Sequence, residues 1–194
     1  MLTIKDLFDL DHTIAKDYLA QFTYPWEALA GIKDFILSVG PTLEDYDEVS
    51  PQVWVHKTAT VAPTAFLGGP CIIGPETEVR HCAFIRGSAL VGAGCVVGNS
   101  VELKNVILFD GVQTPHYNYV GDSILGYKSH MGAGSITSNV KSDKLPVVVR
   151  CGDERIDTGR KKVGAMLGDF VEVGCNSVLN PGSVIGRHSI IYPT

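Results

Sequence analysis

The chain has 194 residues and an acidic balance, with 16 Lys and Arg against 21 Asp and Glu, and a formal net charge of -5 at pH 7. This balance argues against a nucleic-acid-binding protein, because such a protein needs a basic face. Hydrophobic residues make up 45% of the sequence, which excludes wholesale disorder, and no apolar run approaches the roughly 18 residues that span a membrane. The N-terminus has no signal-peptide pattern and the five Cys include no C-x-x-C pair. We therefore expect a cytoplasmic protein without disulfides.

Residues 1–50 are predicted to form a helical N-terminal segment. A first helix is expected over residues 11–21 and a second over residues 25–39, with Pro25 at its start and Gly40-Pro41 as its stop. The apolar residues of the second helix fall on one face, at Trp26, Leu29, Ile32, Ile36 and Val39.

Asp9-Leu10-Asp11-His12-Thr13 has the spacing D-x-D-x-T, which is the aspartyl nucleophile motif of haloacid dehalogenase-type phosphatases. That chemistry needs a surrounding α/β domain with further Lys and Asp motifs, and a repeat that begins near residue 53 leaves no room for it. The pattern therefore favours a helix cap, with Asp11 or Thr13 accepting backbone N–H groups.

From Val55 to Leu103 an aliphatic residue recurs at every sixth position, usually with a small residue four positions later. The spacing slips to five between Leu103 and Leu108 and again between Val120 and Leu125, and a second block runs from Leu167 to Ile191. A period of six fits neither a helix nor simple strand alternation. It predicts an all-β solenoid over residues 51–194, in which three hexads close one triangular coil and about six to seven coils stack.

Residues 140–162 interrupt this repeat with a polar stretch that carries seven Lys or Arg and four acidic residues. Long loops inserted in a solenoid tend to lie on a binding face. The local excess of positive charge indicates a place where an anionic ligand could bind.

The hexad pattern resembles the hexapeptide-repeat family, whose fold is a left-handed parallel β-helix. Four segments follow in the chain: Ile85-Arg86-Gly87, Val97 to Lys104, His116 to Asp122, and Gly132 to Asn139. They resemble the series R-P-G, V-G-N-x-V-E-x-K, H-x-x-Y-x-G-D and G-A-G-T-I-T-x-N in the acetyltransferase domain of bifunctional N-acetylglucosamine-1-phosphate uridyltransferases. The later stretch Thr158 to Gly164 is more similar to the C-terminal domain of archaeal-type sugar-1-phosphate nucleotidylyltransferases.

The resemblance implies transfer of an acetyl group from acetyl-CoA to the 2-amine of a hexosamine 1-phosphate, in a homotrimer whose active sites lie between subunits. His116 matches the catalytic base, which must keep the attacking amine neutral, and the turn at Ala133 offers backbone N–H groups to the oxyanion. The matching substrate-binding residues are Arg86, Lys104, Tyr119, His130 and Asn139. Candidates for contacts with CoA are Asn139, Lys144, Lys161, Lys162 and Cys175.

The sequence departs from the uridyltransferase pattern at several positions: Gly87 replaces Pro, His130 replaces Asn, Val140 replaces Tyr and Cys175 replaces Ser. The basic C-terminal tail that helps to hold CoA is missing, so we expect neighbouring chains or the loop 140–162 to replace it. The first 50 residues are too few for a nucleotidylyltransferase domain, which we expect to be absent. An alternative hypothesis is a non-catalytic module that binds a sugar nucleotide or another protein.

Zinc needs separate consideration, because γ-class carbonic anhydrases share this fold and bind zinc through three His, two of them five residues apart. His81, His116 and His130 lack that spacing, and position 121 is Gly. We therefore expect no metal site.

Overall fold

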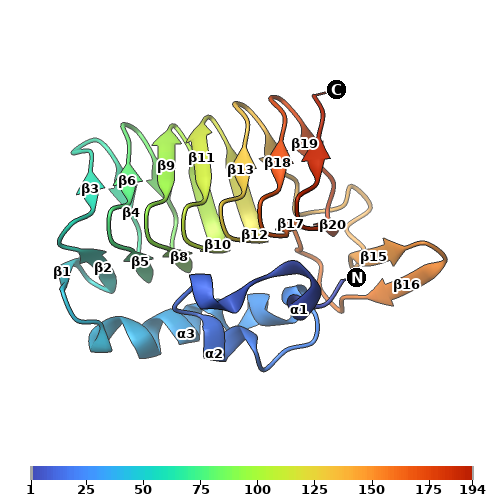
Figure 1. Cartoon of the computed structure of the whole chain (residues 1–194), viewed down its shortest axis with the longest axis horizontal. Helices are drawn as coiled ribbons and strands as arrows, with labels where there is room; N and C mark the ends of the chain where they lie inside the picture. The colour runs from blue at the N-terminus through green and yellow to red at the C-terminus, as the bar shows by residue number, and fades with distance from the viewer. Residues whose placement is uncertain (1, 194) are drawn as a thin grey trace.

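The computed structural model describes residues 2–193; residues 1 and 194, the outer ends of the two predicted segments, lie outside this range. From Val53 onward the chain winds into a left-handed parallel β-helix (Figure 1). This confirms the solenoid predicted from the six-residue repeat and the left-handed β-helix implied by the resemblance to the hexapeptide-repeat family. Within the described range, no helix has the length and apolar character needed to cross a membrane.

Each coil of the solenoid gives one strand, or part of one, to each of three faces, except that the last described coil gives strands to only two of them. The first face contains β2 (Val53–His56), β5 (Cys71–Ile73), β8 (Ala89–Val91), the ends of β10 (Glu102–Leu108) and β12 (Tyr119–Leu125), β17 (Ala165–Leu167) and β20 (Ser183–Ile185). The second face is the seven-stranded sheet of β3 (Thr60–Val61), β6 (Glu78–Val79), β9 (Val96–Asn99), β11 (Gln113–His116), β13 (His130–Met131), β18 (Glu172–Val173) and β21 (Ile190–Ile191). The third face contains β4 (Phe66–Leu67), β7 (Phe84–Ile85), the starts of β10 and β12, β14 (Ile136–Thr137) and β19 (Val178–Leu179).

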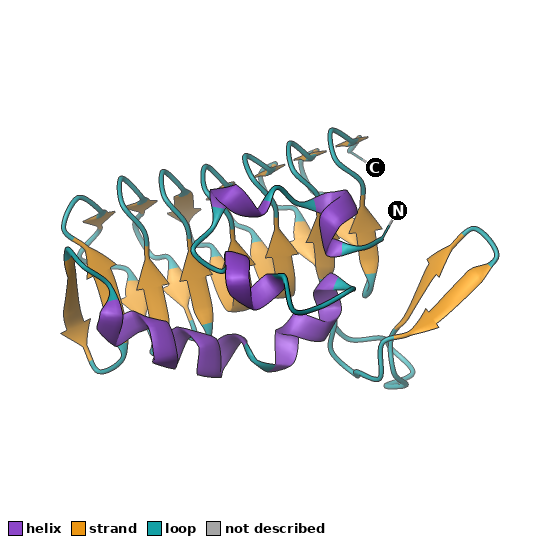
Figure 2. Ribbon diagram, turned by 60° about the horizontal axis from the view of Figure 1, so that its bottom comes forward, coloured by secondary structure: helices purple, strands orange, loops and turns teal. Residues whose placement is uncertain are grey.

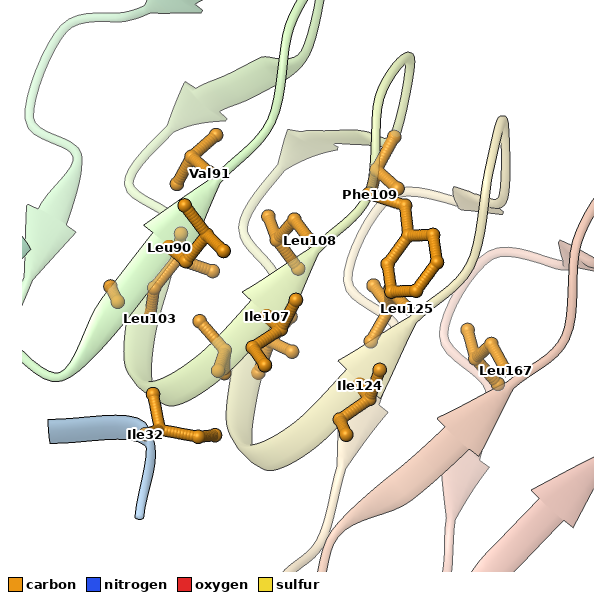
Figure 3. Close-up of a cluster of buried hydrophobic side chains, with 14 of the residues drawn as sticks. Ile32, Leu90, Val91, Leu103, Ile107, Leu108, Phe109, Ile124, Leu125 and Leu167 are labelled. Carbon is orange, nitrogen blue, oxygen red and sulfur yellow. The ribbon is translucent and has the colours of Figure 1, made fainter. Parts of the chain in front are cut away.

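The aliphatic residues of the hexad repeat point into the solenoid and form its core (Figure 3). Leu103, Leu108, Leu125 and Leu167 are fully buried there. Parallel pairing stacks equivalent positions of successive coils, as in the register of Leu103 with Val120. The repeat therefore fixes both the inward direction of each side chain and its neighbours in the next coil.

The two five-residue slips mark the places where one strand runs across a corner. β10 and β12 each belong to two faces, and they pair with each other on both sides of the corner, Glu102 with Tyr119 before it and Val106 with Ser123 after it. At these two corners Asn105 (φ 55°) and Asp122 (φ 47°) take a left-handed backbone conformation, which Asn and Asp tolerate better than most residues.

The N-terminal segment packs across the first face of the solenoid (Figure 2). The strands of that face from β2 to β17 each turn one apolar residue outward, and the segment buries this stripe, which consists of Trp54, Ile72, Leu90, Ile107, Ile124 and Met166. Figure 3 shows Ile32 of the segment near the coils that carry Leu90 and Ile107. The segment contains α1 (Ile4–Leu7), α2 (Lys16–Leu19), α3 (Ile32–Val39), 3-10 helices at Leu10–His12, Pro25–Ala30 and Gly40–Thr42, and β1 (Tyr46–Ser50), which pairs antiparallel with β2.

The helices are shorter than the sequence predicts. The helix expected over 11–21 is reduced to α2 and the preceding 3-10 turn, and the one expected over 25–39 is divided at Gly31. Tyr18 packs closely against the point of division, because a Cβ atom at Gly31 would lie 2.7 Å from its hydroxyl oxygen. That hydroxyl donates a hydrogen bond to the Ala28 carbonyl oxygen, so the bend holds the two helical stretches against α2.

The D-x-D-x-T stretch acts in local capping. Thr13 Oγ1 accepts a hydrogen bond from Ala15 N (3.2 Å), as the cap interpretation predicts. Asp11 is different, because its carboxylate pairs with Lys16, and Asp9 caps the first 3-10 helix by accepting from Asp11 N (3.1 Å). Of the two residues expected to accept backbone N–H groups, Thr13 therefore does so, and Asp11 pairs with Lys16 instead.

A buried carboxylate joins the N-terminal segment to the far end of the solenoid. Asp169 accepts hydrogen bonds from Asp9 N (2.7 Å) and Tyr127 N (2.9 Å) and pairs with Arg187 (2.9 Å). Its own N–H donates to the Leu7 carbonyl oxygen at 3.0 Å. Coils that are distant in sequence from the segment therefore hold it in place.

The insertion at 140–162 leaves the solenoid after β14 and returns before β17. It forms an antiparallel hairpin of β15 (Val148–Cys151) and β16 (Glu154–Asp157), which projects away from the coils (Figure 1, Figure 2).

Candidate active site

Three of the predicted site residues lie along one edge of the solenoid. Arg86 follows β7, Lys104 lies in β10, and Asn139 follows β14; Asp122, at the corner in β12, lies among them. Because successive coils pair in parallel register, residues about 17 positions apart in sequence become neighbours in space. We call this row the Asp122 edge.

The carboxylate of Asp122 is the centre of a hydrogen-bonded network. Lys104 Nζ lies 3.0 and 3.1 Å from its two oxygens, Asn105 Nδ2 donates at 2.9 Å and Asn139 Nδ2 donates at 2.6 Å. The side chain of Asp122 is only 3% exposed, so the buried charge is stable because it is paired and fully hydrogen-bonded. Asn105 also donates to the Leu29 carbonyl oxygen at 3.2 Å, which connects the network to the N-terminal segment.

Tyr119 extends this network onto the third face. Its hydroxyl oxygen accepts a hydrogen bond from Asn139 Nδ2 at 3.2 Å, and partial burial raises the pKa of the phenol, against the opposing effect of that hydrogen bond. A Cβ atom at position 121 would lie 2.5 Å from the Tyr119 hydroxyl and 2.9 Å from Asn139 Nδ2. Gly121 is therefore required for these two side chains to meet.

Arg86 lies at the solvent-exposed end of the same edge. Its guanidinium pairs with Glu102 at 2.7 Å, and its side chain is 46% exposed. The Glu102 carboxylate raises the pKa of Arg86 further above its usual value. An exposed pair of this kind adds little to stability, so the guanidinium can exchange Glu102 for an anionic ligand at small cost.

A hollow of about 540 Å³ opens beside the network, and four cationic residues border it: Lys104, Arg160, Lys161 and Lys162. Asp122 is the only acidic residue of its lining, which Leu29 and Ala30 of the N-terminal segment complete. Arg160 Nε is buried and has no hydrogen-bond partner among residues 2–193. We call this the Lys104 hollow; its charge is suited to an anion.

His116 ends β11 at the neighbouring edge, between the second and third faces. Its ring is exposed, and its backbone N–H donates to Asn118 Oδ1 at 3.2 Å. The buried Asn118 amide in turn donates to the carbonyl oxygens of Gly132 (2.8 Å) and Ser135 (3.2 Å). One asparagine therefore ties the backbone of His116 to the turn of the next coil.

This turn contains the N–H groups expected to serve an oxyanion, and two of the three are already occupied. Gly132 N donates to the Val173 carbonyl oxygen (2.7 Å) and Gly134 N donates to that of His116 (3.0 Å). Ala133 N has no acceptor within residues 2–193. Of the donors that the sequence suggested, Ala133 N–H is thus the one that remains available.

Cys175 continues the row one coil further, because the adjacent Asn176 N donates to the Ala133 carbonyl oxygen at 2.8 Å. We call His116, Ala133 and Cys175 the His116 edge; Cys175 is exposed. Within residues 2–193, no hydrogen bond or ion pair connects the side chains of this edge with those of the Asp122 edge. The corner at Tyr117 (φ 52°) separates them.

Two predicted site residues lie apart from both edges. His130 is on the second face, where its Nδ1 lies 2.7 Å from Glu172 Oε2 and its backbone is in register with Gln113, three residues before His116. Lys144 occupies an exposed turn of the insertion and does not border the Lys104 hollow.

Sequence reasoning did not assign roles to Asp122, Asn105, Arg160 or Asn118. A signal was present for the first two, because each lies within a five-residue slip of the repeat, where a polar residue interrupts small and aliphatic ones. Arg160 and Asn118 act through tertiary contacts that no local pattern reveals.

Comparison with known proteins gives one matching family and several relatives. The profile of the family described as GMPPB C-terminal domain matches residues 69–191. A bifunctional sugar-1-phosphate nucleotidylyltransferase/acetyltransferase of Sulfurisphaera tokodaii is 38% identical over 90 residues, which are 46% of this chain and 22% of that protein. A bifunctional protein GlmU of Methanococcus maripaludis is 32% identical over 180 residues, 91% of this chain and 44% of that protein. The chain thus spans less than half the length of these relatives.

Among solved structures, the acetyltransferase domain of PglB from Neisseria gonorrhoeae in complex with acetyl coenzyme A is 17% identical. The match covers 69% of this chain and 53% of that one, with a TM-score of 0.36.

Proposed function

We propose that this chain, which belongs to the GMPPB C-terminal domain family, is a cytoplasmic acetyl-CoA-dependent N-acetyltransferase that acts on an amino-sugar 1-phosphate. The observation that carries the proposal is the Lys104 hollow, where four cationic residues gather beside the Asp122 network. The name of the relative from Sulfurisphaera tokodaii, a sugar-1-phosphate nucleotidylyltransferase/acetyltransferase, agrees with this substrate class.

The phosphate of the acceptor is assigned to the Lys104 hollow. This gives Lys161 and Lys162 to the sugar phosphate, in place of the contact with CoA expected from the sequence. Lys161, Lys162 and Arg160 offer positive charge that no acidic residue of the lining neutralises, since Asp122 is already paired with Lys104. Charge-assisted hydrogen bonds to a phosphate are roughly twice as strong as neutral ones. Arg86 stands further along the edge, where it can bind the same anion or an adjacent hydroxyl group.

The sugar ring is assigned to the surface beside this hollow. Tyr119 and Asn139 present a hydroxyl and an amide there in a fixed relation to Asp122. Groups held by mutual hydrogen bonds before the ligand arrives lose little freedom on binding.

His116 is assigned as the general base. The amine attacks the thioester carbonyl carbon, and a C–N bond forms while His116 takes a proton from the nitrogen. The carbonyl oxygen becomes an oxyanion, which Ala133 N–H stabilises. When the carbonyl reforms, the C–S bond breaks and the thiolate leaves and takes up a proton. Cys175, one coil beyond Ala133, lies where the acyl carrier would extend from this point.

The separation of the two edges supports a homotrimer. His116 and Ala133 are on one edge, whereas Lys104 and Asn139 are on another. If the His116 edge of one protomer faces the Asp122 edge of its neighbour, base and acceptor site come together between subunits. The N-terminal segment covers the first face and leaves the other two available for this contact.

The test is an assay of thiol release from acetyl-CoA with glucosamine 1-phosphate or galactosamine 1-phosphate as acceptor. His116→Ala is expected to lower kcat by about 10²–10⁴-fold, the usual contribution of a general base. His81→Ala is the matched control, because His81 is an exposed histidine in the same row, two coils earlier, joined to it through Asn99. This control should leave kcat unchanged.

The phosphate assignment has its own readout. Lys161→Ala with Lys162→Ala is expected to raise KM for the sugar phosphate by at least tenfold with a smaller effect on kcat. Absence of thiol release with every hexosamine phosphate contradicts the proposal. Binding of the sugar phosphate without turnover would instead favour the non-catalytic binding module.

A further inference from the structure

The hairpin of the insertion carries two arginines in an unfavourable arrangement. Arg150 of β15 and Arg155 of β16 are directly opposite each other in the antiparallel register. Opposed side chains of such a ladder have Cβ atoms about 5 Å apart, and like charges at these positions are destabilising. A two-stranded hairpin is only marginally stable. The repulsion between the two arginines therefore destabilises the hairpin, and folding alone does not explain why both are present.

Neither arginine is directly paired in the part of the chain that the structure describes. Within residues 2–193, neither guanidinium takes part in an ion pair or a hydrogen bond. Two acids share the groove that the arginines border: Asp143, which pairs with Lys141 at 3.0 Å, and Asp157, which accepts a hydrogen bond from Gly159 N at 2.8 Å. Both guanidinium groups therefore keep their full capacity for an external anion.

Both arginines border a groove of about 1050 Å³ between the hairpin and the last coils, which we call the hairpin groove. This volume is at the upper end of the range for small-molecule sites. Polar side chains line one part, including Ser138 and Asn180, and aliphatic side chains such as Val184 line another. A wall of mixed character suits a ligand that joins charged groups to a flat, less polar ring.

The hairpin is held firmly against the solenoid at its base. Val147 and Val149 are buried, and a Cβ atom at Gly182 would lie 2.6 Å from Val147 Cγ1. Val147 N donates to the Arg160 carbonyl oxygen at 2.7 Å and Gly182 N to that of Gly164 at 2.8 Å. Packing at the base thus anchors the hairpin that carries the two arginines.

We propose that the hairpin groove binds the diphosphate group of a nucleotide, with Arg150 and Arg155 contacting its phosphoryl oxygens. Guanidinium groups match phosphate oxygens in two-pronged geometry, and a diphosphate spans two of them at once. The site is distinct from the Lys104 hollow, with which it shares no lining residue. The diphosphate has two possible sources, the nucleotide part of CoA and a nucleoside diphosphate sugar.

The test is calorimetric titration of the full chain with inorganic pyrophosphate, CoA and uridine diphosphate. Arg150→Ser with Arg155→Ser is expected to weaken pyrophosphate binding at least tenfold. The control is Lys5→Ser with Lys33→Ser, which removes the same two charges from exposed positions of the N-terminal segment and should change the affinity less than twofold. The titrations are repeated in a chain that carries Lys161→Ser and Lys162→Ser, so that the Lys104 hollow does not mask the result.

A second measurement checks the premise independently of the ligand. The unliganded Arg150→Ser, Arg155→Ser variant is expected to melt at or above the temperature of the unaltered chain, because a repulsion has been removed. Tighter binding of CoA than of uridine diphosphate identifies the acyl carrier as the source, and the reverse order identifies a nucleotide sugar. Unchanged pyrophosphate affinity in the arginine variant, or an equal loss in the lysine control, overturns the proposal.

Discussion

Asp122 positions other residues of the candidate site through its hydrogen bonds. Its carboxylate receives donors from three other residues, one of which also reaches the N-terminal segment. The ion pair with Lys104 offsets the desolvation cost of burying the Asp122 carboxylate, so this pair adds little net stability. The network instead fixes the positions of Lys104 and Asn139 relative to each other.

Replacement of Asp122 by Asn tests this role and keeps a residue that tolerates the left-handed backbone at φ 47°. We expect a loss of about 1–3 kcal/mol in the free energy of unfolding, since charge-assisted hydrogen bonds are lost in a buried site. Denaturant unfolding measures it. A double-mutant cycle with Lys104→Met should give a coupling energy clearly different from zero; simple additivity would contradict the network.

Gly121→Ala tests the close approach of Tyr119 and Asn139. The added Cβ would lie 2.5 Å from the Tyr119 hydroxyl, so one of the two side chains must move, at a typical cost of 1–3 kcal/mol. Gly186→Ala is the control, because the nearest atom to its new Cβ is 3.8 Å away. Melting temperatures compare the two variants, and an equal effect of both would show that Gly121 has no special steric role.

Two thiols should be inert and should make stability depend on alkaline pH. Burial raises the pKa of the Cys71 and Cys95 thiols to about 12, from 9.0 for an ordinary thiol. In the unfolded chain they ionise near pH 9 and in the folded chain near 12, so their contribution to stability is present below pH 9 and is lost as the pH rises from 9 to 12.

At pH 10 the loss in the free energy of unfolding amounts to about 1 kcal/mol per thiol. The double variant Cys71→Ala, Cys95→Ala should therefore lose less of this free energy between pH 8 and 10 than the unaltered chain does.

The reactivity of the thiols gives a second test. At pH 8 an aromatic disulfide reagent should modify the exposed Cys82 and Cys175 and spare the two buried thiols until the chain unfolds. Rapid modification of all five in the folded protein would contradict this picture.

At the scale of elements, the N-terminal segment stabilises the fold by burying the outward apolar stripe of the first face. Ile124 turns outward from the first face and is nevertheless fully buried. Ile124→Ala is expected to cost about 2–5 kcal/mol, as for other buried Ile or Leu residues. Val178→Ala, on the third face at 56% exposure, should cost less than about 0.5 kcal/mol. Equal losses in denaturant unfolding would mean that the segment does not seal the first face.

The elements also show what the sequence could predict. The inward residues were predictable because Leu103, Val120 and their equivalents repeat every five or six positions, and strand pairing follows from that repeat alone. The outward stripe was not, because Leu90 and Ile107 recur only once per coil and their burial depends on a segment remote in sequence. The packing of Tyr18 against the helix division at Gly31 is likewise a contact that no local pattern reveals.

The same distinction applies to the site. Arg86, Lys104, Tyr119 and Asn139 could be placed on one edge because their spacing matches the repeat. The positions of Arg160 and Lys161 beside Lys104 depend on how the insertion folds back, and composition gives only its charge.

At the scale of the whole molecule, the covered first face leaves the third face available for association. Phe66 and Phe84 stand on it with ring centroids 5.5 Å apart, and Phe66 is 58% exposed. Phe66→Asp is expected to shift the proposed trimer toward monomer in sedimentation velocity and to lower activity with it. Val49→Asp, at equal exposure on β1, should do neither. A monomeric unaltered chain, or an unchanged trimer in Phe66→Asp, would contradict this association.

The bond between Asp9 and Asp169 also sets an order of events during synthesis. The two residues are 160 positions apart, and a ribosome adds about 5–20 residues per second, so some 8–30 seconds separate their appearance. During that interval the apolar side of the segment, with Trp26 and Leu29, has only part of its partner surface. The first part of the chain to be made is thus among the last to dock. A cell that makes this protein must keep that segment from associating with other chains until the sixth coil has formed.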